Sequence, residues 1–353
     1  MLRAHLRRAG ALPAASARAA QTLLLLSLVA AGACSGDATS SLLPSKPAMS
    51  RASATTATTA TASVLVGASL WVDPASNARQ TGDAWYATRP ADANMLYKLA
   101  AAPQARWFGN WNATIRADVN AATTAITRAG AMPVFVAYNI PQRDCGGLSG
   151  GNSTTASGYR AWIRGFANGL AGRRATVILE PDALAAMDCL NAADQQQRLD
   201  LLVFAVQTLR ASGSVAVYLD AGNPQWHDAE TMSARLRDAG IALAQGFALN
   251  VSSFSLTADN VQYGQVISSL TGGRHFVIDT GRNGLGPAAD GSWCNPAGRA
   301  IGDWPTTRTG VANVDAYLWV KTPGESDGAC NGAPAAGTWM PEYALGLAQR
   351  AGY

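Results

Sequence analysis

The apolar, β-favouring runs of this sequence repeatedly stop at an acidic residue. The run at 177–179 ends in Glu180, Pro181 and Asp182, and the run at 215–219 ends in Asp220. Segments 134–145, 275–284 and 316–328 have the same form. Short apolar runs without polar alternation are typical of parallel strands buried on both faces. Each of these strands is therefore expected to have a carboxylate at or just beyond its C-terminal end.

From residue 64 onward, strand-like and helix-like segments alternate. Strands are expected at 64–72, 106–111, 132–139, 175–180, 215–220, 246–252, 275–279 and 316–321. Helices are expected at 91–101, 115–129, 159–171, 192–211, 228–239, 258–270 and 341–351. About eight β/α units indicate one α/β domain with parallel strands covered by helices. The first strand lacks the Gly-rich phosphate loop of a doubly wound sheet. Polar residues after nearly every strand favour a distorted, TIM-like (β/α) barrel with its active-site cleft at the C-terminal strand ends.

The N-terminal residues predict export. Residues 1–34 combine a basic start, the apolar run 23–31 and small residues before Cys34, which is typical of a signal peptide. The segment Ala31-Gly32-Ala33-Cys34 resembles a lipobox, so we expect lipidation of Cys34 and membrane attachment, with plain cleavage nearby as the alternative. Residues 35–62 are rich in Ser, Thr and Ala and predict a disordered tether. The catalytic domain is expected at 63–353.

Cysteine and histidine content limits the chemistry. Of five Cys, four remain after Cys34, namely Cys145, Cys189, Cys294 and Cys330, and in an exported domain these allow three disulfide pairings. The sequence has three His and no C-x-x-C spacing, so few residues could form a zinc site or a Ser-His-Asp triad. Carboxylates could bind Ca²⁺ or Mg²⁺, but no loop has dense ligand spacing. We expect no metal and no cofactor.

The charge distribution restricts the partners. The net charge of +4 is small, and much of it lies in the first 18 residues, so a nucleic-acid partner is not expected. Ten Trp is a high count, and several lie beside turn residues, where exposed aromatic faces commonly bind sugars. We expect a monomer that binds a carbohydrate.

Four aspartates form the candidate catalytic set. Asp144, Asp182, Asp220 and Asp327 lie at or just beyond strand ends, so a barrel would gather them at one mouth. Crowded carboxylates push one another's pKa values apart, so one stays protonated while others are ionised. This arrangement suits glycosidic-bond hydrolysis. An Asp at a strand end is often only a helix cap, so the case depends on recurrence.

Five segments resemble, in the same order, the signature segments of glycoside hydrolase family 6. They are YNIPQRDCGGLSGG (138–151), ILEPDAL (178–184), YLDAGNPQWH (218–227), IDTGRNGLGP (278–287) and LWVKTPGESDG (318–328). The resemblance covers about residues 64–353. It implies an inverting cellulase that acts on β-1,4-glucan.

The resemblance also implies catalytic roles. Asp182 would be the general acid, with Asp144 beside it to raise its pKa and order the water. Tyr138 would favour distortion of the sugar in the −1 subsite, and Asp220 would assist near the acid. Asp327 is the candidate base, acting directly or through a chain of waters.

Further residues are implied to contact the substrate as aromatic platforms or polar ligands. Trp226 and Trp293 match platforms on either side of the cleavage point, whereas Trp71 and Trp107 are weaker candidates. Arg282 could equally pair with Asp182 or Asp327. Glu180 is assigned only a supporting structural role. The polar substrate-binding candidates are Asn250, Arg282, Lys321 and Glu325.

The family pattern pairs Cys145 with Cys189 and Cys294 with Cys330, each pair pinning a loop that borders the cleft. Exo-acting members roof the cleft with longer loops in these regions. Segments 146–188 and 295–329 are short here, which favours an endoglucanase. The alternatives are a cellobiohydrolase of the same family and a carbohydrate-binding lipoprotein without catalysis.

Overall fold

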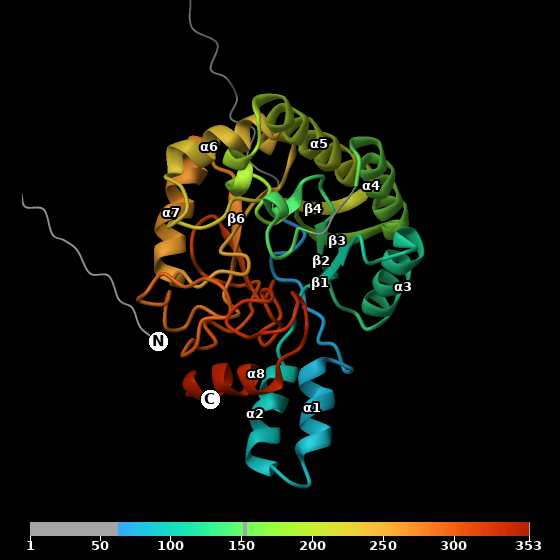
Figure 1. The fold of residues 1–353 in the computed structure, drawn as a ribbon. Coiled ribbons are helices and arrows are strands. Elements are labelled where there is room, and N and C mark those ends of the chain that lie inside the picture. Colours follow the sequence, from blue (N-terminus) through green and yellow to red (C-terminus); the bar gives the residue numbers. More distant parts are fainter. Residues whose placement is uncertain (1–62, 151–153, 353) are drawn as a thin grey trace, which may run out of the picture. The chain divides into compact units, whose positions relative to one another are not determined.

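Seven parallel strands form one sheet in the computed structural model, which describes residues 63–150 and 154–352. Each strand pairs with the next one along the sequence (Figure 1). The strands are β1 (Arg106–Gly109), β2 (Val134–Tyr138), β3 (Gly172–Leu179), β4 (Gly213–Asp220), β5 (Gly246–Leu249), β6 (His275–Asp279) and β7 (Val314–Leu318). This curled sheet confirms the distorted, TIM-like barrel. The expected signal, Cys34 and the tether at 35–62 lie outside the described residues.

The helices form two groups. Five of them surround the strands: α3 (Ile115–Arg128), α4 (Ala156–Leu170), α5 (Ala192–Ala211), α6 (Ala229–Asp238) and α7 (Thr257–Leu270). The others lie together beside the barrel in Figure 1: α1 (Asn77–Trp85), α2 (Pro90–Ala100) and α8 (Pro341–Arg350). Short 3₁₀ turns occur at η1 (Arg143–Gly146), η2 (Ala185–Cys189) and η3 (Ile241–Leu243). No helix in the described part of the chain is both long and apolar enough to span a bilayer.

Alternation along the strands separates two cores. Phe135, Val177 and Val217 belong to the large cluster that includes buried residues of the surrounding helices. Val136 and Ile178, at the alternate positions, belong to the cluster that fills the barrel interior. Successive side chains point to opposite faces of a sheet, so Tyr138, two positions beyond Val136, belongs to the same interior cluster. Tyr138 therefore points toward the barrel axis at its C-terminal end.

The first and last strands approach each other without a full ladder. Ala105 N donates to Trp319 O at 3.0 Å, and the Trp107 indole Nε1 donates to Val320 O at 2.7 Å. These bonds join Ala105, just before β1, and Trp107, within β1, to the two residues that follow β7. They connect the first and last strands of the curled sheet.

The segment at 64–72 is not a strand, contrary to our prediction. Residues 64–67 form a turn, Gly67 has φ 73°, and only Leu70 makes a bridge, with Met132. Leu65 is fully buried in the cluster that fills the barrel interior. The apolar run therefore reflects burial of an irregular segment, and the barrel has seven strands instead of eight.

Helix α1 was missed because its sequence is mostly polar. Ser76 caps it by accepting a hydrogen bond from Arg79 N at 3.3 Å, and only Ala78 and Gly82 are buried. A Cβ added to Gly82 would lie 2.6 Å from Cε1 of Tyr97, so the glycine lets α1 pack closely on α2. A helix that contributes two small residues to a core lacks an apolar periodicity.

A third hydrophobic cluster lies where α2 and α8 pack together, and Trp319 should be its most costly single deletion. It is 1% exposed and clusters with Leu96 and Leu99 of α2 and Leu345 of α8. Trp319→Ala should lower the free energy of unfolding by roughly 3–5 kcal/mol, because a large cavity replaces the indole. Chemical denaturation measures this. Leu243→Ala, at a position that is 47% exposed, is the control and should stay within about 0.5 kcal/mol; equal losses in both variants would contradict the packing role.

Candidate active site

The C-terminal ends of the strands open into a cleft of about 1370 Å³. Its walls bring together residues that are far apart in the sequence, including Asp144, Asp182 and Asp327. Most of the expected site residues are found here. Besides the three aspartates, the wall contains Trp71, Trp107, Tyr138, Trp226, Trp293, Lys321 and Glu325.

Behind this wall lie buried carboxylates at the strand ends. Glu180, directly after β3, is fully buried. Its Oε1 accepts from Asn139 N at 3.0 Å, and its Oε2 accepts from Asn139 N at 2.9 Å and from Ile140 N at 3.0 Å. Glu180 thus binds the backbone that leaves β2, which accords with the expected structural role. Burial raises its pKa to about 7, although these backbone bonds oppose the shift.

Asp220, the last residue of β4, holds the backbone of the residue expected to be the acid. Its Oδ1 accepts from Asp182 N at 3.0 Å and from Gly222 N at 3.1 Å. Its Oδ2 is buried and has no hydrogen-bond partner among the described residues. Burial raises the pKa of Asp220 to about 7 against the two backbone bonds. Asp220 is 1% exposed and lies beneath the cleft wall.

Asp182 lies in the cleft wall, where its surroundings disfavour the charged carboxylate. Burial raises its pKa well above the ordinary value, and the charges of Asp220, Asp144 and Asp327 raise it further. Both Glu180 and Asp182 have positive φ, 50° and 69°, so the chain turns sharply between them. The turn separates the two side chains, because Glu180 is fully buried beside Tyr159 of α4, whereas Asp182 lies in the cleft wall.

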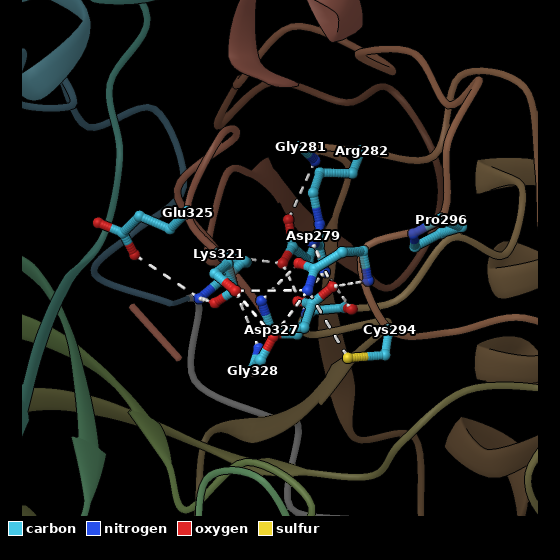
Figure 2. Close-up of polar contacts among 12 residues, drawn as sticks. Asp279, Gly281, Arg282, Cys294, Pro296, Lys321, Glu325, Asp327 and Gly328 are labelled. Carbon is cyan, nitrogen blue, oxygen red and sulfur yellow. Dashed lines mark hydrogen bonds and ion pairs between the residues drawn. The ribbon is translucent and has the colours of Figure 1, made fainter. Parts of the chain in front are cut away.

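Asp279, the last residue of β6, repeats the role of Glu180. Its Oδ1 accepts from Gly281 N at 3.0 Å and Val320 N at 3.2 Å, and its Oδ2 accepts from Lys321 N at 2.9 Å and Ser252 N at 3.1 Å (Figure 2). One side chain therefore connects the loops after β5, β6 and β7. Burial raises its pKa, and the backbone bonds oppose the shift. Our sequence reasoning noted this strand end but gave Asp279 no role.

Asp144 is held by a bond network that the sequence reasoning missed. Its Oδ2 accepts from Ser149 N at 2.9 Å and Ser149 Oγ at 3.0 Å, and the Tyr138 hydroxyl lies 2.8 Å from the same Oγ. Arg143 donates to Tyr138 O at 2.7 Å and to Ser149 O at 2.7 Å, with its guanidinium 4.1 Å from the centre of the Tyr138 ring. Arg143 and Ser149 lie within segment 138–151, and the resemblance of this segment to the family was the sequence signal that could have identified them.

Asp327 is fixed as an ion pair. Its Oδ1 lies 2.9 Å from Arg282 Nη2, and its Oδ2 accepts from Arg282 Nη1 at 3.0 Å and from Asn295 N at 2.9 Å (Figure 2). The side chains are 1% exposed for Arg282 and 5% for Asp327. A two-point guanidinium–carboxylate contact fixes the orientation of the carboxylate as well as its charge. Of the two partners expected for Arg282, the structure shows Asp327.

Asn250 and Arg282 lie behind the wall instead of lining it. Asn250 is fully buried; its Nδ2 donates to Asp279 O at 2.8 Å and its Oδ1 accepts from Ser255 N at 3.0 Å. Its amide is thus occupied by backbone groups that connect the loop after β5 to β6. Both residues were expected to bind substrate, and neither is among the residues that line the cleft.

Lys321 and Glu325 form a polar corner of the cleft. Lys321 Nζ lies 3.7 Å from Glu325 Oε2 and donates to Ser326 O at 3.1 Å (Figure 2). Burial lowers the pKa of Lys321 and raises the pKa of Glu325, while their mutual attraction opposes both shifts. An ammonium and a carboxyl group at a cleft wall provide donors and acceptors for ligand hydroxyls. Among the described residues, no group of three or more His, Cys, Asp or Glu could hold a metal ion.

The two disulfides pair as the family resemblance implied. Cys145 bonds to Cys189, and Cys294 bonds to Cys330, with Cα atoms 6.1 and 6.4 Å apart. Cys145 follows Asp144, and Cys189 ends the turn that follows Asp182. The first disulfide therefore links the loops of the two aspartates. The second links the Asn295 loop to the Asp327 loop.

A barrel with clustered carboxylates and exposed Trp side chains at its C-terminal mouth is typical of a glycoside hydrolase. The family model described as glycosyl hydrolases family 6 matches residues 65–351. This chain belongs to that family, whose members are inverting glycoside hydrolases.

Individual relatives agree with this assignment. Endoglucanase A from Cellulomonas fimi is 45% identical over 284 residues, which is 80% of this chain and 61% of that protein, so this chain spans less than two thirds of it. Endoglucanase 1 from Streptomyces halstedii is 44% identical over 286 residues, 78% of this chain and 86% of that protein.

Solved structures show the same fold. Endoglucanase Cel6 from Mycobacterium tuberculosis, in complex with methyl-cellobiosyl-4-deoxy-4-thio-β-D-cellobioside, has a TM-score of 0.77 and 47% identity, covering 82% of this chain and 99% of that one. The catalytic core of the cellobiohydrolase Cel6A from Chaetomium thermophilum has a TM-score of 0.71 and 28% identity, covering 81% and 97%.

The raised pKa of Asp220 predicts a pH-dependent stability difference. In Asp220→Asn the amide oxygen can still accept from Asp182 N and Gly222 N, but the buried charge is gone. Because the pKa of Asp220 rises from 3.8 to about 7 on folding, its ionisation destabilises the folded state as the pH rises through this interval. The wild type should therefore lose up to roughly 4 kcal/mol of unfolding free energy relative to the variant.

Urea denaturation at about pH 4.5 and about pH 7.5 measures this difference. Asp279→Asn is the matched control, because the amide nitrogen would face backbone donors that the carboxylate now accepts from. That variant should be less stable than the wild type at both pH values. Parallel pH dependence in the wild type and Asp220→Asn would contradict the buried-charge interpretation.

Proposed function

We propose that this protein hydrolyses internal β-1,4-glucosidic bonds in cellulose or a related β-glucan by an inverting single displacement. The observation that carries the proposal is the position of Asp182. It lies in the cleft wall, and burial together with the charges of Asp220, Asp144 and Asp327 raises its pKa well above the ordinary value. A carboxyl group whose pKa is raised holds its proton to higher pH and can protonate a leaving glycosidic oxygen.

In this proposal the other carboxyl groups order water, raise the pKa of Asp182 and accept a proton. Asp144, held by Ser149, raises the pKa of Asp182 and orders water with the Tyr138 hydroxyl, while the Tyr138 ring favours a distorted sugar at subsite −1. Asp327 accepts the proton of the attacking water, directly or through a chain of waters, and Arg282 fixes its orientation. Asp220 assists from beneath Asp182. Inversion requires acid and base far enough apart for a water molecule between them, which suits groups from β3 and β7.

The proposed subsites use the exposed aromatic residues. Trp226 and Trp293 are 44% and 61% exposed, and both belong to the cleft wall. An exposed indole provides a flat apolar face on which a pyranose ring can stack. Trp71 is a further, weaker platform. Lys321 and Glu325 bind sugar hydroxyls near subsite −1 or −2.

The endo mode is supported by the similarity to relatives. The two endoglucanases are 44–45% identical to this chain, compared with 28% for the Chaetomium cellobiohydrolase core. The short segments at 146–188 and 295–329 agree with an open groove. We further propose export and lipid attachment at Cys34, and the two disulfides are consistent with an extracellular location.

The endo mode predicts rapid loss of polymer length. Incubation with carboxymethylcellulose should reduce viscosity steeply while few reducing ends appear, because each internal cut shortens the polymer. Viscosity and reducing ends measured on the same samples check this. A slow fall in viscosity relative to sugar release would identify the cellobiohydrolase alternative. Retained sugar binding without any release would identify the inactive binding protein.

Removal of Asp182 should depend on the leaving group. Asp182→Ala should reduce hydrolysis of cello-oligosaccharides by about 10²–10⁴-fold, the usual contribution of a general acid. A dinitrophenyl cello-oligosaccharide should be affected far less, because its leaving group departs without protonation. Steady-state kinetics on both substrates measure the contrast. Asp200→Ala, which removes an exposed carboxylate on α5, is the control. Equal losses on both substrates would remove Asp182 from the acid role.

A further inference from the structure

Trp111 is a large exposed aromatic side chain to which the family resemblance gives no role. It follows β1 by two residues, is 55% exposed and forms part of the cleft wall. Because the strands follow one another around the sheet, β2 and β3, which deliver Asp144 and Asp182, lie between β1 and β4. Trp226 follows β4. Trp111 and Trp226 therefore flank the two catalytic candidates, one on each side.

The indole of Trp111 is seated on the backbone of Gly109. A Cβ added to Gly109 would lie 2.4 Å from Cζ3, 2.5 Å from Cη2 and 2.8 Å from Cε3 of the ring, so any larger residue would displace it. Asn112 holds the turn, because its N donates to Gly109 O and its Oδ1 accepts from Gly109 N, both at 3.0 Å. The ring is thus supported on one side and exposed on another.

The guanidinium group of Arg143, although close to Trp111, does not cover the exposed part of its ring. The Arg143 guanidinium carbon lies 5.9 Å from the centre of the Trp111 ring, compared with 4.1 Å from that of Tyr138. Arg143 is therefore seated on Tyr138 instead of covering Trp111. A supported indole that exposes apolar area inside a cleft gains free energy when a ligand with an apolar face covers it.

We propose that Trp111 is an additional sugar platform that binds a glucosyl unit on the β1 side of the cleft and so favours longer chains. This inference rests on the proposed β-glucanase function. The CH groups on one face of a glucopyranose ring match the exposed indole. A chain that spans Trp226, the acid and Trp111 contacts more apolar surface than a short oligosaccharide, which ends before it reaches Trp111.

The test compares kcat/KM for cellotriose through cellohexaose. Trp111→Ala should lose roughly five- to tenfold more on cellohexaose than on cellotriose, as expected for one lost aromatic contact. Trp111→Phe should recover part of the loss. Gly109→Ala should reproduce the length dependence although the indole is retained, because its Cβ displaces the ring. Tyr86→Ala removes an aromatic residue that is 58% exposed and does not line the cleft, so its length profile should match the wild type.

A binding measurement separates this inference from the proposed function. In the Asp182→Ala background, calorimetry should show that Trp111→Ala weakens binding of cellohexaose more than binding of cellotriose. Equal effects at both lengths, or no effect, would overturn the platform. Failure of the wild type to hydrolyse any β-glucan would overturn the proposed function alone, because the length dependence of binding would still decide the role of Trp111.

Discussion

Hydrogen bonds from the backbone to buried carboxylates at the strand ends organise the whole site. A parallel sheet leaves backbone N–H groups without ladder partners where its strands end and the loops begin, and buried donors must be satisfied. Glu180, Asp220 and Asp279 accept these donors, and each reaches the loop of at least one neighbouring strand. The loops after β2 and β3 are thereby tied to β3 and β4. The loops after β5 and β7 are both tied to β6.

The same arrangement creates the electrostatic environment of the cleft. A carboxylate that accepts several backbone N–H bonds is favoured in its charged form, yet burial disfavours the charge, and for Glu180 and Asp220 burial outweighs the bonds. For Asp182, burial and the charges of Asp220, Asp144 and Asp327 all raise the pKa. Asp220 therefore both fixes the backbone of Asp182 and raises the pKa of its carboxyl group.

The sequence could predict the chemistry better than the depth of each residue. The recurrence of an acidic residue after an apolar run was enough to place Asp144, Asp182 and Asp327 in one cleft. Depth depends on the turn that follows each strand. Glu180 and Asp182 both have positive φ, so the alternation of β3 does not continue past its end; Glu180 is buried beside Tyr159 of α4, whereas Asp182 reaches the cleft wall. Such turns have no apolar periodicity, so Asn250 and Asp220 were expected nearer the cleft surface than they are.

Residues that act through others were the hardest to predict. Ser149 has meaning only because Asp144 and Tyr138 meet at its hydroxyl, and Arg143 only because it connects Tyr138 to the backbone of Ser149. Both residues belong to segment 138–151, which resembles the family. A contact among three side chains, however, depends on how that loop folds. The prediction of a strand at 64–72 was wrong for a related reason. Its apolar residues are buried as expected, but Leu65 fills the barrel without joining the ladder.

Two carboxyl groups of the cleft, those of Asp182 and Asp327, lie in opposite electrostatic environments. The proposed single-displacement mechanism needs this difference between its acid and its base. Asp182 is surrounded by burial and negative charge, whereas Asp327 is held at two points by a guanidinium that is itself 1% exposed. The two-point contact fixes the orientation of the Asp327 carboxyl group. In the mechanism that we propose, Asp182 gives a proton and Asp327 receives one. Each environment is set by a residue behind the wall, because Asp220 lies beneath Asp182 and Arg282 beneath Asp327.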